Sequence, residues 1–495
     1  MLTIEEIRKF INEDTASIKK KNAVTGARYY DGDHDIKDYR LFYYNSDGNL
    51  VEDKTRSNIK ISHPFFTEQV DQAVQYILSG EQFIRSDIPE LQEELDAYFN
   101  ENEDFTAELS ECLTGCMAKG FEYMYAYKNA ENKLAFECAD SIGVIEVEGR
   151  FTQDGRDYVI YWLIDRIDID GHVIKRIQVW DDEQTWYYTQ SDDGEIMEDE
   201  YVELNPKPHI LYSKAGEPET YYDSLGFIPF FRLDNNKKQV SNLKTIKDLI
   251  DDYDLHSCSL SNNLVDFDTP IHVVKGFEGD NLDELQQNLK TKKLIGMESS
   301  DQGAGLEIKT VDIPYQARQA KLELDEKNIY RFGMALNTAG LKDTNATTNI
   351  AIKSAYALLD MKCNKLEIRL KQFLRKILKV VVAEINSNNG TDYEMKDVYF
   401  CFEHEVMTNA QENAQIELTE AQKKQIEINI ILSLANTLDS ETVIQMLCDT
   451  LDIDYMDIKD KLPSDEEKAT DEAQAVLDGV VTDEQETEGS NAGAA

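Results

Sequence analysis

The chain has 495 residues, and its 51 Lys and Arg residues against 96 Asp and Glu residues leave a formal net charge of −45. This charge excludes a protein that binds nucleic acid or an anionic membrane over much of its surface, because such binding rests on basic patches, although brief local contact with DNA stays possible. With 41% hydrophobic residues, the chain is too apolar for a disordered acidic protein and has the length of roughly two to four domains.

Nothing in the sequence favours secretion or a membrane. Residues 1–10 are amphipathic and do not read as a signal peptide, and the most apolar stretches, 377–385 and 428–435, fall far short of the roughly 20 residues of a membrane span. Seven scattered cysteines contain no CxxC pair and form no disulfide framework. We therefore expect a soluble, intracellular protein with reduced thiols and no membrane partner.

The first 240 residues predict a mixture of helix and sheet. After the amphipathic start, hydrophobic spacing predicts helices from Phe65 to Leu78 and from Ile88 to Ala126. Asp-Gly pairs, which favour tight hairpin turns, then separate β-rich runs and predict a β-meander at about 134–235. The pairs are Asp31-Gly32, Asp47-Gly48, Asp154-Gly155, Asp170-Gly171 and Asp193-Gly194.

From Ser241 the pattern changes to long helices around a compact insert. Apolar residues at three- and four-residue steps predict a helix over 241–267, about 26 residues or roughly 39 Å long. A second helix is expected over 315–336. The insert between Pro270 and Pro314 is expected to hold short elements, namely strands at 271–274, 293–296 and 306–311 and a helix at 282–289.

A very long helix follows. No Pro occurs between Pro314 and Pro463, and neither Gly nor Pro occurs from Leu341 through Asn389. A near-heptad seam runs along this stretch, made of Leu359, Cys363, Leu366, Leu370, Phe373, Ile377 and Val381. Periodicity alone fits a buried helix of an ordinary domain equally well. Beyond it we expect a strand at 397–404, helices at 410–435 and 440–448, and a disordered acidic tail from Ser464.

Common catalytic motifs are missing from the sequence. It contains no P-loop, no GxSxG elbow, no HExxH and no strand-linked GxGxxG. Carboxylate pairs such as Asp251-Asp252 are expected by chance in so acidic a chain, and Cys112 with Cys116 fits small core residues better than a metal face. We predict no catalytic residue, no metal and no cofactor.

Two features are more informative. The first is the helix, insert and second helix, which together predict a long hairpin with a compact tip. The second is the polar segment 337–349, whose single cation is Lys342. Its Asn, Thr and Gly residues suit a flexible hydrogen-bonding loop, and without further information it fits a simple helix connector as well.

At these residues the sequence resembles the portal proteins of tailed bacteriophages, in particular the SPP1 Gp6-like family. The strongest run is Leu225-Gly-Phe-Ile-Pro-Phe230, then Asn235-Asn236, then the helix pattern that begins at Ser241. The resemblance covers about residues 20–460. One departure is Thr348-Asn349-Ile350, where the family often has Ser-Gly before its long helix.

The resemblance implies an α+β portal fold with an α/β wing, a two-helix stem, a small α/β clip, a long wing helix and a mainly helical crown. The implied boundaries are 1–240 for the N-terminal part of the wing, 241–267 and 315–336 for the stem helices, 268–314 for the clip, 337–349 for the tunnel loop, 350–390 for the long wing helix, 391–463 for the crown and 464–495 for the acidic tail.

It also implies a function. Portal subunits form a ring, typically of twelve, at one capsid vertex, through which the terminase packages double-stranded DNA that later leaves by the same channel. The implied partners are the terminase large subunit, a head-completion adaptor, and the major capsid and scaffolding proteins. The implied location is the virion, and the host cytoplasm during assembly.

Two sets of site residues follow from the same resemblance. The DNA-facing tunnel loop would present Lys342, Asp343, Thr344, Asn345, Thr347 and Thr348. The clip would face the terminase and adaptor with Phe277, Asp280, Asp283, Lys290, Lys292 and Lys293. The alternatives are another acidic capsid-vertex or connector ring protein and, in a different class, an acid-dependent hydrolase.

Overall fold

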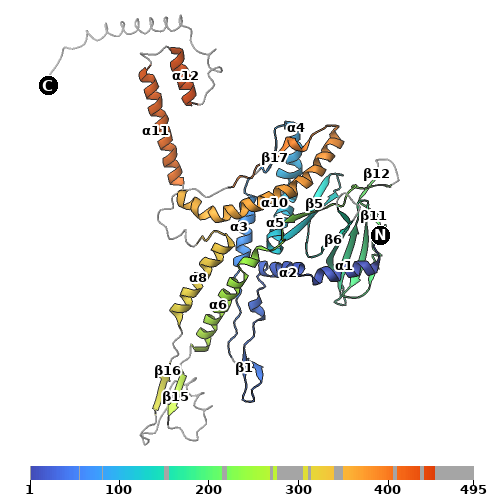
Figure 1. The fold of residues 1–495 in the computed structure, drawn as a ribbon, viewed down its shortest axis with the longest axis vertical. Helices are drawn as coiled ribbons and strands as arrows, with labels where there is room; N and C mark the ends of the chain where they lie inside the picture. Colours follow the sequence, from blue (N-terminus) through green and yellow to red (C-terminus); the bar gives the residue numbers. More distant parts are fainter. Residues whose placement is uncertain are drawn as a thin grey trace, which may run out of the picture. The chain divides into compact units, whose positions relative to one another are not determined.

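The protein divides into two compact units. The computed structural model describes residues 2–54, 56–80, 82–149, 155–213, 220–267, 271–275, 305–309, 314–338, 349–404, 410–434 and 440–451. One unit comprises residues 1–346 and 350–406, and the other comprises residues 347–349 and 407–495. The larger unit mixes helices with several small sheets (Figure 1), so the predicted α+β class is confirmed.

The largest sheet is an antiparallel meander. Its strands are β6 (Val144–Glu148), β7 (Arg156–Ile167), β8 (Val173–Trp180), β9 (Gln184–Ser191), β10 (Ile196–Glu198) and β11 (Lys207–Pro208). Strands β6 to β10 pair in chain order, and β11 also pairs with β9. Gly171 turns the β7–β8 hairpin with a φ of 88°, as its Asp-Gly pair predicted. At the β9–β10 hairpin, where the turn does contain Asp193-Gly194, the left-handed residue is Asp192 rather than Gly194, so that detail of the prediction was wrong.

A second sheet and four helices form the main core. The sheet has the order β14 (Phe230–Asp234), β4 (Phe121–Lys128), β5 (Leu134–Ala139). The helices are α3 (Phe65–Ile77), α4 (Pro89–Leu95), α5 (Glu103–Lys119) and α10 (Asn349–Asn389). One continuous apolar cluster joins these elements, and the predicted α10 seam lies wholly inside it, with each residue at most 4% exposed. The long helix and its buried face are therefore confirmed.

The predicted helix from Ile88 to Ala126 was wrong. Helix α4 runs into a π-helical turn at Asp96–Asn100, α5 starts afresh, and residues 121–128 form β4. The side chain of Asn102 caps α5 by accepting the Phe105 N–H, and Gly120 ends the helix at a φ of 98°. Aromatic residues occupy every second position after Gly120 and so share one face of this strand, and the first four residues of the strand are all buried.

The smaller elements surround this core. These smaller elements are α1 (Ile4–Ala16), α2 (Ile18–Tyr30), short 3-10 turns at Asp35–Asp38, Asn242–Thr245 and Met395–Asp397, and the strand pairs β1 (Phe42–Tyr44) with β2 (Leu50–Glu52), β3 (Ile84–Ser86) with β17 (Val398–Phe400), and β12 (Ile210–Ser213) with β13 (Thr220–Asp223). Strand β17 is shorter than the predicted strand over 397–404.

Two neighbouring helices carry a strand pair at their far end. Helix α6 (Lys247–Phe267) packs against α8 (Tyr315–Gly333). Beyond them β15 (Ile271–Lys275) pairs antiparallel with β16 (Gly305–Lys309), with Ile271 opposite Lys309. The predicted helix–insert–helix hairpin is thus present (Figure 1). A 3-10 turn at 242–245 shortens α6 to 21 residues from the expected 26. The expected elements at 282–289 and 293–296 lie outside the described residues.

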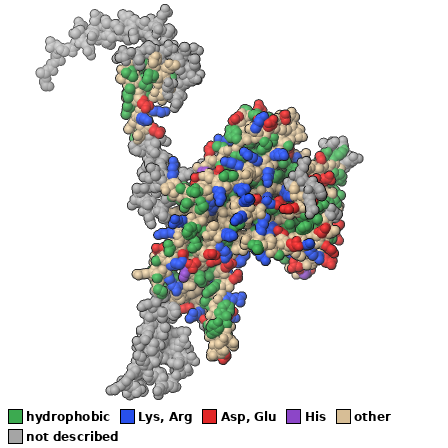
Figure 2. Space-filling view, in the orientation of Figure 1, with side chains coloured by type: hydrophobic (Ala, Val, Ile, Leu, Met, Phe, Trp, Pro, Cys, Tyr) green, Lys and Arg blue, Asp and Glu red, His purple; other side chains and the backbone are tan. Residues whose placement is uncertain are grey.

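The smaller unit contains α11 (Ala410–Leu434) and α12 (Ser440–Leu451), which pack on each other. Both helices were predicted. The acidic tail lies outside the described residues. In the larger unit, Lys and Arg side chains gather over α10 (Figure 2), although the whole chain is strongly acidic.

Candidate functional site

Both predicted sets of site residues lie outside the part of the chain that the structure describes. For the tunnel loop these are Lys342, Asp343, Thr344, Asn345, Thr347 and Thr348; for the clip they are Phe277, Asp280, Asp283, Lys290, Lys292 and Lys293. The structure does describe the contacts that hold the chain before and after these two sets of residues. We call these contacts supports and treat them together as the candidate functional site.

The first support is the contact between the paired helices and α3. Phe65, the first residue of α3, packs edge-on against Tyr253 of α6 at 4.9 Å and against Tyr330 of α8 at 5.9 Å between ring centroids. The ammonium of Lys321 forms ion pairs with Asp252 across the helix pair and with Asp325 on its own helix. Helices α6 and α8 are therefore fixed to each other and to the start of α3.

The second support is an extended segment that lies along α6. The backbone N–H groups of Ser57, Ile59 and Ile61 donate to Asp266 Oδ1 at 3.1 Å, Asn262 Oδ1 at 2.7 Å and Cys258 Sγ at 3.1 Å. Alternate residues of an extended chain lie about 6.6 Å apart, and side chains four apart on a helix rise by about 6.0 Å, so the two repeats match. We call this set of bonds the α6 ladder. It fixes residues 57–61 against the helix.

Asp254 is a buried residue at the N-terminal end of the α6 ladder, and its carboxylate binds two histidines. Its Oδ1 accepts from the backbone N–H of His63 at 3.0 Å and lies 2.7 Å from His63 Nδ1, while its Oδ2 lies 2.7 Å from Nδ1 of the buried His34. Burial raises the pKa of Asp254, but the hydrogen bonds of the two histidines outweigh burial and hold the pKa below its ordinary value. The carboxylate thus ties α6 to two separate N-terminal segments.

Ser257, His63 and Asp254 lie in the order of a nucleophile, a base and an acid. Ser257 Oγ is 3.5 Å from His63 Nε2, at the outer limit of a hydrogen bond. Asp254 is shared with His34, and Ser257 lies in mid-helix, where its N–H is already used and leaves no oxyanion donor beside it. The arrangement is structural.

The third support holds the chain where it leaves α8. The Gln72 amide donates to the Leu336 carbonyl at 3.1 Å and accepts the Leu336 N–H at 3.1 Å. The Tyr330 hydroxyl donates to Glu68 at 2.6 Å, and the Gln69 amide donates to the Ile329 carbonyl at 3.3 Å. One face of α3 therefore fixes the last turn of α8 and the residues that lead into the predicted loop.

Lys362 of α10 also contacts the last turn of α8 and α3. Its ammonium donates to the carbonyls of Gly333 at 3.2 Å and Gln69 at 3.4 Å, and burial lowers the pKa of Lys362 to about 8. A Cβ on Gly333 would lie 1.8 Å from the Gln69 side-chain oxygen, so any larger residue there would displace the Gln69 amide. The end of α8 before segment 339–348 and the part of α10 around Lys362 are thus both fastened to α3.

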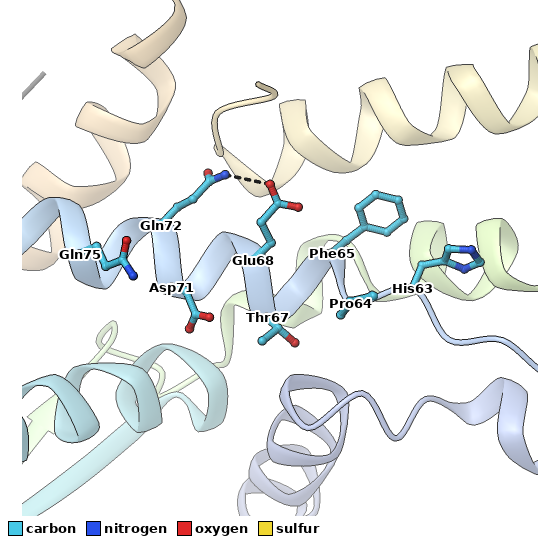
Figure 3. A pocket seen from close by; sticks show the side chains of 8 residues that line it. All are labelled: His63, Pro64, Phe65, Thr67, Glu68, Asp71, Gln72 and Gln75. Atoms are coloured by element: carbon cyan, nitrogen blue, oxygen red, sulfur yellow. Dashed lines mark hydrogen bonds between the residues drawn. The ribbon is translucent and has the colours of Figure 1, made fainter. Parts of the chain in front are cut away.

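A hollow of about 560 Å³ lies beside α3 (Figure 3). Glu68 and Gln72 point to one side of the helix, and Thr67 and Asp71 to the other. Among the residues that the structure describes, all those lining the hollow fall between His63 and Gln75, so no second described element brings groups together there. The hollow does not have the form of an active site.

Sequence reasoning missed Asp254, His63, Gln72 and Lys362 because their partners are far away along the chain. The α6 ladder did leave a signal, since Asp254, Cys258, Asn262 and Asp266 repeat every four residues. Within the described residues no cluster of three or more His, Cys, Asp or Glu side chains could hold a metal ion. No helix in the described part is long and apolar enough to cross a membrane.

Comparison with known proteins shows the family of the chain. Residues 9–452 match the family described as phage portal protein, SPP1 Gp6-like. The chain is 28% identical over 385 residues to a portal protein of Bacillus phage SPP1, covering 76% of this chain and 73% of the relative. It is 24% identical over 424 residues to a portal protein of Clostridium phage phiCD119, covering 84% and 89%. The chain therefore belongs to the SPP1 Gp6-like phage portal proteins, which are structural components of the virion and not enzymes.

Proposed function

We propose that copies of this chain form a ring of twelve at one capsid vertex and that double-stranded DNA passes through it, inward during packaging by the terminase and outward during ejection. The observation that carries the proposal is the α6–α8 pair. It ends in the β15–β16 strand pair, and α3 and Lys362 of α10 hold the end of α8 that leads into segment 339–348. Side by side around an axis, such pairs would line a tube.

In this proposal each segment of the chain has its own role. Residues 241–267 and 315–336 are the stem, 268–314 the clip, 337–349 the tunnel loop and 391–463 the crown, while 1–240 and 350–390 form the wing. The clip, with Phe277 and Lys290 among its contact residues, meets the terminase large subunit first and a head-completion adaptor later. The wing meets the major capsid and scaffolding proteins. Assembly takes place in the host cytoplasm.

The charge of −45 suits a channel that conducts DNA without binding it. Each phosphate that a Lys or Arg neutralises releases a counterion and adds affinity, so a wall rich in cations would retain the duplex. A single Lys342 per subunit, with Asn345, Thr347 and Thr348 beside it, makes weak and transient phosphate contacts. The rest of the wall repels the duplex.

Ring formation is tested by native mass spectrometry and negative-stain images of the purified chain. We expect a closed particle of twelve subunits with an axial opening. Chains that stay monomeric at all concentrations, alone and with scaffolding protein, would contradict the proposal.

The role of Lys342 is tested separately with Lys342→Ala and the control Lys353→Ala, which removes an exposed cation from α10. We expect Lys342→Ala to change packaging rate or DNA retention while assembly stays intact, and the control to behave as wild type. An unchanged rate and retention in Lys342→Ala would show that the lysine has no such role.

A further inference from the structure

Helix α10 has a second seam, on its exposed side. Alongside the buried seam, residues at steps of 3, 4, 3, 4, 3 and 4 face solvent. They are Leu358, Met361, Lys365, Ile368, Gln372, Arg375 and Lys379. Met361 is 62% exposed and Ile368 is 61% exposed. We call this set the α10 outer face. Three of its residues, Leu358, Met361 and Ile368, are large and aliphatic, and a helix face that exposes such side chains can bury them against a partner.

The α10 outer face is basic in an acidic protein. Residues 349–389 contain eight Lys and Arg against three Asp and Glu, a net charge of +5 in a chain of −45. Figure 2 shows these cations gathered over α10. Within the described residues no carboxylate forms an ion pair with Lys365, Lys376 or Lys379. A concentration of unpaired cations beside exposed aliphatic side chains is characteristic of a surface that awaits an acidic partner.

The same chain carries a complementary surface. From Ser86 to Ala118 there are ten Asp and Glu and no Lys or Arg. Several of these carboxylates on α4, on α5 and between them are exposed, namely Glu90, Glu93, Glu101, Glu103, Asp104 and Glu111. We call these residues the acidic edge.

The α5 part of the acidic edge and α10 lie on different sides of α3, whereas α4 lies at the C-terminal end of α10, where Asn389 donates to Glu94 at 2.9 Å. Helix α3 packs against α5 and contacts α10 through Tyr76, whose hydroxyl donates to Asp360 at 3.3 Å, and through the Ala73 carbonyl, which accepts from Cys363. Figure 3 shows α10 and α5 on opposite sides of α3. A head-to-tail ring needs two different surfaces that face opposite ways and complement each other.

We propose that the α10 outer face of one subunit docks on the acidic edge of the next copy around the ring. This inference rests on the proposed ring and names the surfaces that close it. Exposed Leu358, Met361 and Ile368 favour a protein partner over DNA, because nucleic-acid interfaces are polar and basic while protein interfaces bury aliphatic groups at their centre. The acidic edge supplies the charge complement without a second kind of protein.

Charge reversal tests the docking directly. Variant A carries Lys365→Glu, Arg375→Glu and Lys379→Glu. Variant B carries Glu103→Lys, Asp104→Lys and Glu111→Lys. Each variant places like charges at every interface, so we expect each alone to need at least about tenfold more protein than wild type for half-assembly. A 1:1 mixture should recover wild-type assembly, because alternating subunits bring opposite charges together at every interface. Native mass spectrometry should then show equal numbers of A and B.

A matched control separates local pairing from net charge. Lys9→Glu, Lys237→Glu and Lys238→Glu change the chain's charge as variant A does, at exposed positions away from α10, and we expect wild-type rings. Thermal unfolding of each variant as a monomer checks that it folds.

Three outcomes would overturn the inference. If A or B forms rings as readily as wild type, the faces do not meet. If the mixture fails to recover assembly, they do not meet each other. If A keeps its rings but loses retention of duplex DNA, the basic face serves nucleic acid. If wild-type chains form no ring at all, both the proposed function and this inference are wrong. If wild-type chains form rings and one of the three outcomes above is seen, only this inference is wrong.

Discussion

Lys362 places a cation among carbonyl groups, and in the described part of the chain no carboxylate pairs with it. Because burial penalises the charged form, its pKa falls to about 8, against about 10.4 for an ordinary lysine. Between these two values the unfolded chain binds more protons than the folded one, so Lys362 makes stability rise with pH over that window. The charge is kept at neutral pH because its ammonium satisfies the carbonyls of Gly333 and Gln69.

Lys362→Met should therefore flatten the pH dependence of stability. We expect the free energy of unfolding of wild type, minus that of the variant, to increase from pH 8 to pH 10. Urea unfolding at several pH values measures it. Lys353→Met, which removes an exposed lysine from the same helix, should leave the wild-type slope. A slope unchanged in Lys362→Met would show that this ammonium is already solvated.

Gln72 is the residue that fixes the exit of α8. Gln72→Ala leaves the N–H and carbonyl of Leu336 without their partner, and we expect a loss of about 1–3 kcal/mol in the free energy of unfolding. Hydrogen exchange at the Leu336 amide should rise as well. Gln75→Ala, one turn further along α3 (Figure 3), is the control and should cost much less. Equal losses in the free energy of unfolding of the two variants would show that Gln72 has no special role.

At the scale of elements, the α6 ladder makes a local prediction. Asn262→Ala removes the acceptor of the Ile59 N–H, so exchange of that amide should speed up while the core of α5 stays protected. Asn263→Ala changes the same kind of residue at the next position of α6 and serves as the control. If both variants exchange alike at Ile59, the extended segment is held by something other than the ladder.

The elements differ in how far the sequence determines them. The α10 seam was predictable because a repeat of three and four residues over seven positions has one simple structural solution. The break between α5 and β4 was missed because apolar residues run on through Gly120, where only the cap and the aromatic alternation reveal the change. The contacts of Asp254 could not be predicted, since His34 and His63 lie 220 and 191 residues away in sequence.

At the scale of the whole molecule, the charge acts in two opposite ways. Each subunit carries a net charge of −45, so neighbouring subunits repel each other over any distance at which salt does not screen them. The α10 outer face and the acidic edge attract each other only when they are in contact. The repulsion is long-ranged and grows with the product of the subunit charges. The attraction is short-ranged and partly shielded from solvent, so salt weakens it less.

Moderate salt should therefore favour the ring. The Debye length falls from about 30 Å at 0.01 M to about 8 Å at 0.15 M, which removes most of the repulsion between whole subunits but leaves pairs in contact largely unscreened. We expect analytical ultracentrifugation to show fewer rings at 0.01 M than at 0.15 M salt, and sucrose added at equal osmolality to have no such effect. Rings equally abundant at both salt concentrations would mean that neighbouring wings already neutralise each other's charge before they close, and long-range repulsion would no longer limit assembly.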